Sequence, residues 1–205
     1  MLINFQYLFK KYRLKITGIL HIGAHELQEL SKYSICGVKD ITWVEAMDDK
    51  VNQMKLKFPT QKIINAVVSD KDNEEIIFNV SNNEESSSIL KFGTHTQEHP
   101  HIKFVEHRNY KTITLKKLVD EEKINIDNIN FLNLDIQGAE LKALRGLGDY
   151  LKKIDYIYSE VNEKELYIGC DLIGSLDQYL EEFGFRRVET SMTKHGWGDA
   201  FYIKN

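Results

Sequence analysis

Glu45, Asp135 and Glu160 are the acidic side chains of this sequence with the clearest potential for chemistry. Each follows a short run of apolar and β-branched residues, which is the pattern of a buried strand. Carboxylates gathered in one crevice bind an ammonium group, accept hydrogen bonds from ribose hydroxyls or take up a proton. The ordinary alternative is a solvated carboxylate at a strand end or, for Asp135, the N-cap of a helix.

A second candidate is the segment His21-Ile22-Gly23-Ala24-His25, which ends the first strand-like run. Gly23 permits close approach of the backbone to a ligand, and a following helix offers unpaired amide groups. Glu45 stands about twenty residues further on, where an acidic side chain of nucleotide-binding folds accepts hydrogen bonds from a ribose. A tight turn without a ligand is the alternative, but the two features together favour a nucleoside-containing cofactor.

The histidines His95, His99, His101 and His107 invite the question of a metal site, because imidazoles at short spacing share an ion. His95 and His99 lie close enough to share an ion only if the segment between them is helical. Pro100 and the preceding serines argue against a helix there. We therefore expect no bound metal, and we keep His95 as one candidate for a general base.

Strands and helices that alternate along the chain must position these side chains. Strands are expected at 18–22, 41–44, 62–68, 110–114, 130–134, 156–159, 185–189 and 200–203, and helices at 26–33, 49–58, 115–122, 139–151 and 172–183. This order predicts an α/β fold with a doubly wound, mostly parallel sheet and helices on both faces. Because ligands bind beyond the carboxyl ends of such strands, the three acidic residues should face one crevice.

The middle of the chain departs from this rhythm. Residues 75–80 alternate apolar and polar side chains, which predicts an antiparallel strand. Residues 81–100 form a long polar insertion, which we interpret as a mobile flap over the ligands. Its serines and asparagines between Ser81 and Ser88 are expected to stay outside any core, and a surface insertion without a role is the alternative.

Composition limits the class of protein. The 205 residues suit one domain, 1–205, that begins with a helix within 1–15. The net charge of −4 argues against a nucleic-acid partner. Cys36 and Cys170 have no disulfide or zinc spacing, no apolar run is long enough to span a membrane, and no signal peptide is evident, so we expect a cytoplasmic protein. The N-terminal helix is expected to pack on the sheet, with a membrane-surface position as the alternative.

Six phrases in order give this sequence a resemblance to the FkbM family of methyltransferases. They are HIGAHELQE at 21–29, WVEA at 43–46, NAVVSD at 65–70, NLDIQGAELKALRG at 133–146, YSEVNEKELYIGC at 158–170 and HGWGDAFYI at 195–203. The resemblance implies the seven-stranded, Rossmann-like methyltransferase sheet. It also implies S-adenosylmethionine as the cofactor.

The resemblance further implies which residues surround that cofactor. Gly23 and Ala24 would approach its methionine part and Glu45 its ribose, while residues 65–67 would border its adenine. His21, His25 and Leu27 depart from the general pattern of one acidic residue and spaced glycines, so the amino group needs another carboxylate, Asp135 or, behind it, Glu29. The complete expected set is His21, Gly23, Ala24, His25, Glu45, Ala46, Asn65, Ala66 and Asp135.

The function expected from the resemblance is methylation of a hydroxyl on a sugar, a glycan or another small acceptor. Transfer to oxygen needs alignment and loss of a proton, and Asp135, Glu160 and His95 are the contenders for the base. A nicotinamide-dependent dehydrogenase is one alternative, although the segment has only one of the glycines that cradle a pyrophosphate. A non-catalytic module that binds the cofactor is the other. The acceptor and the oligomeric state stay open.

Overall fold

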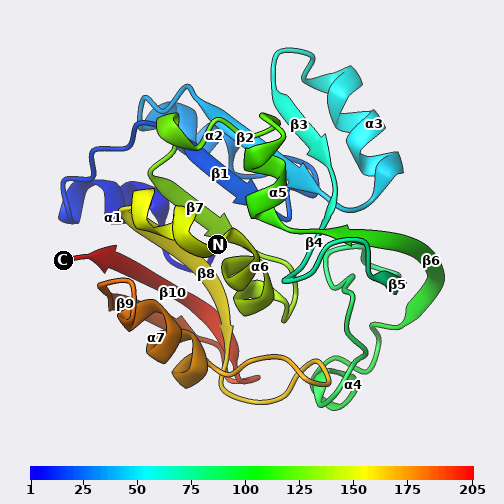
Figure 1. Cartoon of the computed structure of the whole chain (residues 1–205). Helices are drawn as coiled ribbons and strands as arrows, with labels where there is room; N and C mark the ends of the chain where they lie inside the picture. Colours follow the sequence, from blue (N-terminus) through cyan, green and yellow to red (C-terminus); the bar gives the residue numbers. More distant parts are fainter.

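A seven-stranded sheet runs through the centre of the computed structural model, which describes residues 1–205 (Figure 1). The strand order is β3-β2-β1-β7-β8-β10-β9, and β10 alone runs antiparallel to its neighbours. This confirms the predicted doubly wound, mostly parallel sheet. The strands are β1 (Ile19–Ile22), β2 (Ile41–Glu45), β3 (Lys62–Asn65), β7 (Phe131–Leu134), β8 (Tyr156–Asn162), β9 (Phe185–Met192) and β10 (Trp197–Lys204).

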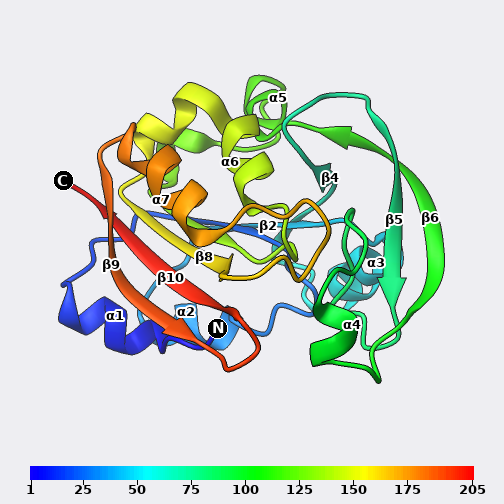
Figure 2. The same cartoon turned by 90° about the horizontal axis from the view of Figure 1, so that it is seen from below.

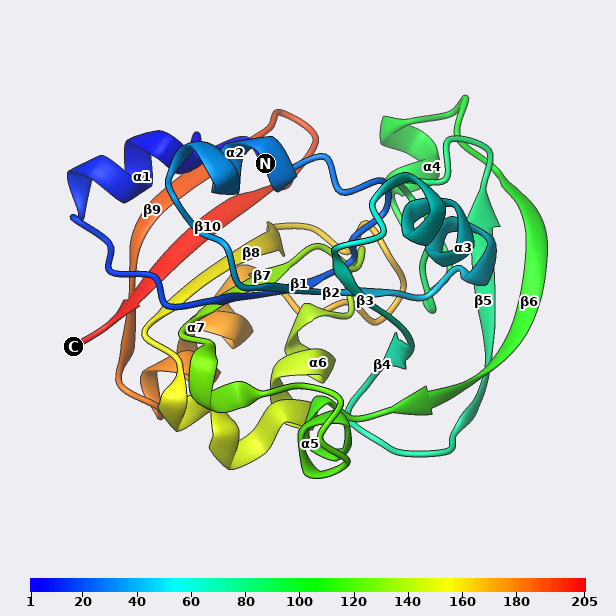
Figure 3. The ribbon, with the colours of Figure 1, turned by 90° about the horizontal axis from the view of Figure 1, so that it is seen from above.

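Helices cover both faces of this sheet, as Figure 3 shows when the sheet is seen nearly edge-on. One face carries α1 (Phe5–Lys11), α2 (Leu30–Ile35) and α3 (Asp48–Lys57), whose apolar side chains form one buried cluster with the sheet. The other face carries α5 (Leu115–Asp120), α6 (Glu140–Leu147) and α7 (Ile173–Glu181), which contribute to a second cluster. Since helices cover both faces, β1, β2 and β7 are buried at every position instead of alternating between buried and exposed. No helix has the length and apolarity to cross a bilayer.

A second, three-stranded sheet stands to one side of the first (Figure 2), beyond the edge that β3 forms (Figure 3). It pairs β4 (Val67–Val68) parallel with β6 (Phe104–Ile113), and β6 antiparallel with β5 (Glu75–Ser81). The antiparallel strand predicted at 75–80 is therefore confirmed. The single strand predicted at 62–68 is wrong, because the chain leaves β2 at Ala66 and continues alongside β6. The strand expected at 110–114 is the end of the longer β6.

Three helix boundaries also differ from the predictions. The helix expected at 26–33 starts only at Leu30, since His25 and Leu27 adopt left-handed backbone angles that no helix contains. The helix expected at 139–151 ends at Leu147, where Gly148 has a φ of 58°, and a 3-10 segment, η2 (Gly148–Lys153), follows. Only Phe5–Lys11 of residues 1–15 is helical, and it packs on the sheet as expected. A short 3-10 turn, η1 (Ile126–Asn128), precedes β7.

At Gly23 the loop after β1 lies tightly against the loop after β7. The amide of Asp135 donates to the carbonyl of Ile22 at 3.0 Å, so the two loops after β1 and β7 start side by side. Gly23 has a φ of +89°, and a Cβ there would lie 1.9 Å from the carbonyl oxygen of Asp135. Glycine is therefore required at this position for both conformation and space.

We predict that Gly23→Ala destabilises the protein far more than Gly37→Ala. Gly37 has a similar φ of +79°, but no atom lies within 4 Å of the position that a Cβ would take there. Its substitution should cost about 1 to 2 kcal/mol of backbone strain, whereas Gly23→Ala adds an overpacking cost of about 1 to 3 kcal/mol. Denaturant unfolding of both variants measures the difference. Equal losses would contradict the assigned contact with β7.

Candidate functional site

A cavity of about 390 Å³ lies at the carboxyl ends of β1, β2, β7 and β8. Gly23, Glu45, Asp135 and Glu160 all line it, although they come from four different strands. The expectation that the three acidic residues face one crevice is thus met in the geometry. The volume is in the range of pockets that hold small ligands.

Glu45 is held rigidly at the end of β2. One carboxylate oxygen accepts the backbone N–H of His25 at 2.8 Å, and the other accepts that of Met47 at 2.9 Å. The side chain is buried, and this burial raises the pKa of its carboxyl group. Because each carboxylate oxygen accepts more than one hydrogen bond, Glu45 keeps acceptor capacity for a ligand in the cavity.

Three residues expected around the cofactor do not line the cavity. His21 is buried in the α2 side of the core, with Nδ1 3.0 Å from the hydroxyl of Tyr33, and burial lowers its pKa to about 4. Ala24 packs in the same core cluster. Asn65 lies on the surface, where its amide donates to the carbonyl oxygens of Glu45 and Ala46. These residues shape the loops around the cavity instead of facing into it.

The remaining expected residues do reach the cavity. His25, Ala46 and Ala66 line its walls beside Gly23 and Glu45. His95 lines it from the inserted segment, far along the chain from the strands of the main sheet. Eight of the eleven expected site residues therefore line the cavity, but the sequence did not indicate which side of β1 faces it.

Gln137 joins Asp135 to Glu160. Its amide nitrogen donates to Oδ1 of Asp135 at 2.8 Å and also to a carboxylate oxygen of Glu160. Its amide oxygen accepts the hydroxyl of Tyr167 at 2.6 Å. Gln137 has a φ of 56°, an uncommon angle for a residue with a side chain, which turns the loop so that the amide lies between the two carboxylates. Sequence reasoning missed Gln137 and Tyr167, since no local pattern marks such a bridge.

The ionised forms of two carboxyl groups near Asp135, those of Glu160 and Glu140, are destabilised. Burial, with the charges of Asp135 and Glu140 nearby, raises the pKa of Glu160 well above its ordinary value. Burial raises the pKa of Glu140 to about 7, although its carboxylate accepts the amides of Ile136 and Gly138. A buried carboxylate with a raised pKa is a better proton acceptor than an ordinary one, which suits general-base chemistry.

The charge of the lining is one-sided. It holds no lysine and no arginine. The carboxylate residues along it are Glu29, Glu45, Glu84, Glu85, Asp135, Glu160 and Asp199. Of these, Asp199 accepts the hydroxyl of Tyr158 and the amide of Leu2, contacts that the sequence did not indicate. A cavity of this composition favours cationic or uncharged ligands over anionic ones.

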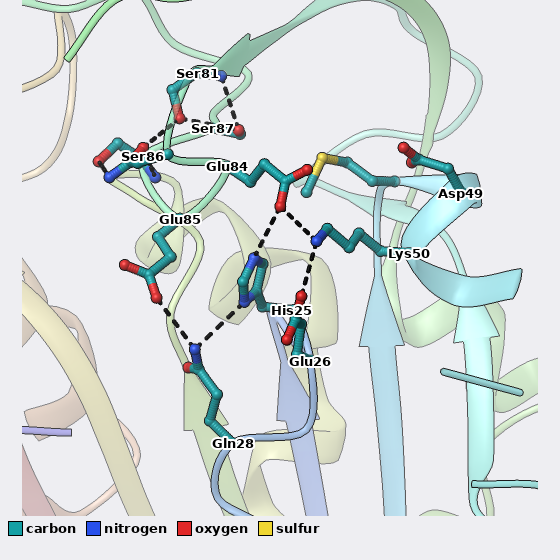
Figure 4. A network of polar contacts seen from close by, with 12 residues as sticks. His25, Glu26, Gln28, Asp49, Lys50, Ser81, Glu84, Glu85, Ser86 and Ser87 are labelled. Atoms are coloured by element: carbon teal, nitrogen blue, oxygen red, sulfur yellow. Dashed lines mark hydrogen bonds and ion pairs between the residues drawn. The ribbon is translucent and has the colours of Figure 1, made fainter. Parts of the chain in front are cut away.

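A polar network connects the inserted segment to the loop after β1 and to α3 (Figure 4). The buried ammonium group of Lys50 contacts Glu26 at 3.0 Å and also contacts Glu84. Nε2 of His25 lies 3.8 Å from the same carboxylate of Glu84. Three segments that are distant in sequence thus meet above the Glu45 end of the cavity.

His25, Glu26 and Glu84 are also close enough together to hold a metal ion. Their carboxylates already surround the Lys50 ammonium, which supplies the positive charge at this point. The histidines of the inserted segment do not form a group of ligands of this kind, even though His95 starts a one-turn helix, α4 (His95–Glu98). The expectation that Pro100 prevents any helix here is wrong, because α4 ends before it.

The inserted segment is packed rather than loose in this structure. Ser81, Ser86, Ser87 and Ser88 are buried, so the expectation that they stay outside packed regions is wrong. Their hydroxyl groups have hydrogen-bond partners, among them the carbonyl of Gln137, which accepts from Ser88 at 2.8 Å. Buried hydroxyls are tolerated when they are paired in this way. The amides at 93–95 donate to the carbonyls of residues 165 and 166, which attaches α4 to the loop after β8.

Solved structures share this architecture at low sequence identity. A ribosomal protein L11 methylase from Lactobacillus delbrueckii subsp. bulgaricus aligns with a TM-score of 0.51 and 7% identity, over 98% of this chain and 76% of that chain. A magnesium protoporphyrin IX methyltransferase from Synechocystis PCC 6803, solved with SAM, aligns at 0.49 and 8% identity, over 98% and 76%. The fold is the Rossmann-like methyltransferase fold.

The curated proteins yield no significant match to the sequence. A family profile does: residues 21–187 match the Methyltransferase FkbM domain. That stretch contains β1, β2, β7 and β8 and every expected site residue, Glu45, Asp135 and Glu160 among them. The chain therefore belongs to the FkbM family of methyltransferases.

Proposed function

We propose that the protein is an S-adenosylmethionine-dependent O-methyltransferase that acts on a hydroxyl of a sugar, a glycan or another small acceptor. One observation carries the proposal: a single cavity is lined by the loops of Gly23 and Glu45 and, next to them, by the network of Asp135, Gln137 and Glu160. The two loops suit a nucleoside cofactor, and the network suits proton removal. Membership of the FkbM family supports methyl transfer.

Residues along the cavity fit this cofactor. Gly23 lines the cavity without a side chain, and Glu45 offers acceptors for ribose hydroxyls. Asp135, with Glu29 behind it, would bind the amino group, and Ala66 would border the adenine. A lining without lysine or arginine suits a sulfonium and an ammonium group. It disfavours the pyrophosphate of a nicotinamide dinucleotide, the alternative cofactor.

Glu160 is the base that the contacts favour among the three contenders. When bound, the cofactor would supply an electrophilic methyl group for the acceptor oxygen. The carboxylate of Glu160 would accept the proton that the acceptor hydroxyl loses. The raised pKa of Glu160 makes it the stronger proton acceptor, and the Gln137 amide holds it in place. Burial lowers the pKa of His95 to about 4, which makes it a weak base. Asp135 is committed to the cofactor amino group.

Transfer of a labelled methyl group tests this proposal directly. The protein is incubated with methyl-labelled S-adenosylmethionine and separate acceptors that carry hydroxyl, amine or nucleic-acid targets, and the products are located by NMR. We expect label on oxygen of a hydroxylated small molecule and none on RNA, because the lining has no lysine or arginine to neutralise its phosphates. Recovery of label on nitrogen, or cofactor binding without transfer to any acceptor, would favour an N-methyltransferase or a non-catalytic module.

We predict that Glu45→Gln weakens binding of S-adenosylhomocysteine at least about tenfold. Losing charge-assisted hydrogen bonds to the ribose costs about 1.5 to 3 kcal/mol. Calorimetric titration measures the affinity, and unfolding of the free variant checks that the backbone contacts to His25 and Met47 survive. Glu75→Gln, an exposed change on β5, is the matched control. Wild-type affinity in the Glu45 variant would rule out the ribose assignment.

A second prediction concerns pH. The base must be ionised to act, and the folded-state pKa of Glu160 lies above the ordinary value of 4.5, so kcat/KM should rise with pH through that raised pKa and then level off. Glu160→Gln should lower the rate by roughly 100-fold or more and remove this rise. Asp135→Asn, measured at saturating cofactor, should move the rise to lower pH because it removes a repelling charge. An unchanged pH profile in both variants would exclude Glu160 as the base.

We also propose that residues 81–100 open as a flap to admit ligands. The contacts of Glu84 with Lys50 and His25 support this, since a partly exposed carboxylate fastens the segment to α3 and to the loop after β1 (Figure 4). Glu84→Gln should weaken the fastening by about 1 kcal/mol and speed release of S-adenosylhomocysteine about fivefold. Stopped-flow kinetics measure the rate, with Glu121→Gln, which breaks an exposed ion pair elsewhere, as control. Equal release rates in the two variants would argue against a flap at this point.

A further inference from the structure

The end of the cavity beneath the inserted segment has an aromatic wall. His95, His99 and Tyr167 line it together with Trp197 from the start of β10. The ring of His95 stacks on Phe92 with centroids 4.1 Å apart and lies 5.5 Å from the ring of Tyr167. None of these residues belongs to the end of the cavity assigned to the cofactor.

His95 is a buried polar side chain, and one of its ring nitrogens has no hydrogen-bond partner. It is 4% exposed, and its Nδ1 has no partner within the protein. Buried polar atoms are nearly always paired. Because His95 lines the cavity, its unpaired nitrogen indicates that a polar ligand completes this end.

The charge of this end narrows the class of ligand. Burial lowers the pKa of both His95 and His99, so these imidazoles are uncharged near neutral pH. No lysine or arginine lines the cavity, and Asp135 and Glu160 lie along it. The N-terminal ammonium of Met1 also lines the cavity, but it lies 4.0 Å from the carboxylate of Glu29. A phosphate or carboxylate group brought against His95 would meet no lysine or arginine and would face the like charges of Asp135 and Glu160.

The aromatic wall adjoins the proposed base. Tyr167 lies beside the ring of His95 and donates its hydroxyl to Gln137. Gln137 in turn donates to Glu160. A compound held against the wall therefore lies next to the network that would remove its proton.

We propose that the wall formed by His95, His99, Tyr167 and Trp197 is the acceptor site, and that it selects an uncharged, hydroxyl-bearing ring whose hydroxyl hydrogen-bonds to the imidazole of His95. Aromatic side chains contact the apolar face of such a ring, while the imidazole nitrogen satisfies a hydroxyl. This rests on the proposed function, whose acceptor class it narrows.

A series of probes on one six-membered ring tests the charge selection. Methyl glucoside is uncharged, glucosamine is cationic, and glucuronic acid and glucose 6-phosphate are anionic. Their binding to the protein saturated with S-adenosylhomocysteine is measured by calorimetry. We expect methyl glucoside to bind at least tenfold more tightly than either anionic ring. Tighter or equal binding of an anionic ring, or no binding of methyl glucoside, would overturn the proposal.

Variants at His95 test the contact itself. His95→Phe keeps a ring against Phe92 but removes both nitrogens, so the affinity for methyl glucoside should fall at least tenfold while that for S-adenosylhomocysteine stays within twofold. His95→Asn and His95→Gln place a polar atom near one or the other nitrogen position, and one of them should recover part of the loss. His107→Phe, on exposed β6, is the matched control. Unchanged methyl glucoside affinity in His95→Phe would refute the assigned contact.

These experiments distinguish failure of the acceptor-site proposal from failure of the proposed function. Ring binding is read with S-adenosylhomocysteine alone, without any transfer. If S-adenosylhomocysteine did not bind, or if label were recovered only on nitrogen, the proposed function would fail. If the cofactor bound and transfer to oxygen occurred but the probes showed no dependence on charge or on His95, the acceptor site alone would be wrong.

Discussion

Burial of carboxyl groups near one another, without lysine or arginine beside them, is the constraint on which the site depends. Glu140 and Glu160 are both buried close to Asp135, and each is raised in pKa by lost hydration and by repulsion. Only neutral donors offset this cost: the amides of Ile136 and Gly138 on one side and the Gln137 side chain on the other. Protonation of a carboxylate or binding of a cationic ligand lowers the electrostatic repulsion in such a site. The same repulsion therefore destabilises the empty site and supports its proposed chemistry.

That arrangement requires the strand ends to meet closely. β1 and β7 run in parallel register, and at their ends the carbonyl of Asp135 occupies the space that a side chain of residue 23 would need. The left-handed angles of Gln137 and Gly138 then turn the chain back before α6 begins. This turn brings the Gln137 amide between Asp135 and Glu160. Backbone geometry therefore sets the electrostatics of the cavity.

The sequence predicts those parts of the molecule that follow from local patterns. Apolar strand runs and the parallel-sheet rule place Glu45, Asp135 and Glu160 at one edge, whereas the same rule does not say which face of β1 each side chain takes, so His21 and Ala24 were misplaced. The Ser86 to Ser88 segment looks solvated by composition, yet long-range hydrogen bonds bury it. The pairing of β4 with β6 spans more than forty residues and has no local signal.

The inserted segment links the two halves of the proposed reaction. Ser88 donates to the carbonyl of Gln137, so the segment that carries His95 also braces the loop that holds the base. Under the proposed function, methyl transfer removes the positive charge of the sulfonium while the acidic lining keeps its own. The product is then held less strongly than the substrate by the same carboxylates. Under the proposed function, the charge that favours binding of the methyl donor therefore also favours release after transfer, and the Glu84 contacts are those that the proposed flap would break to let the product leave.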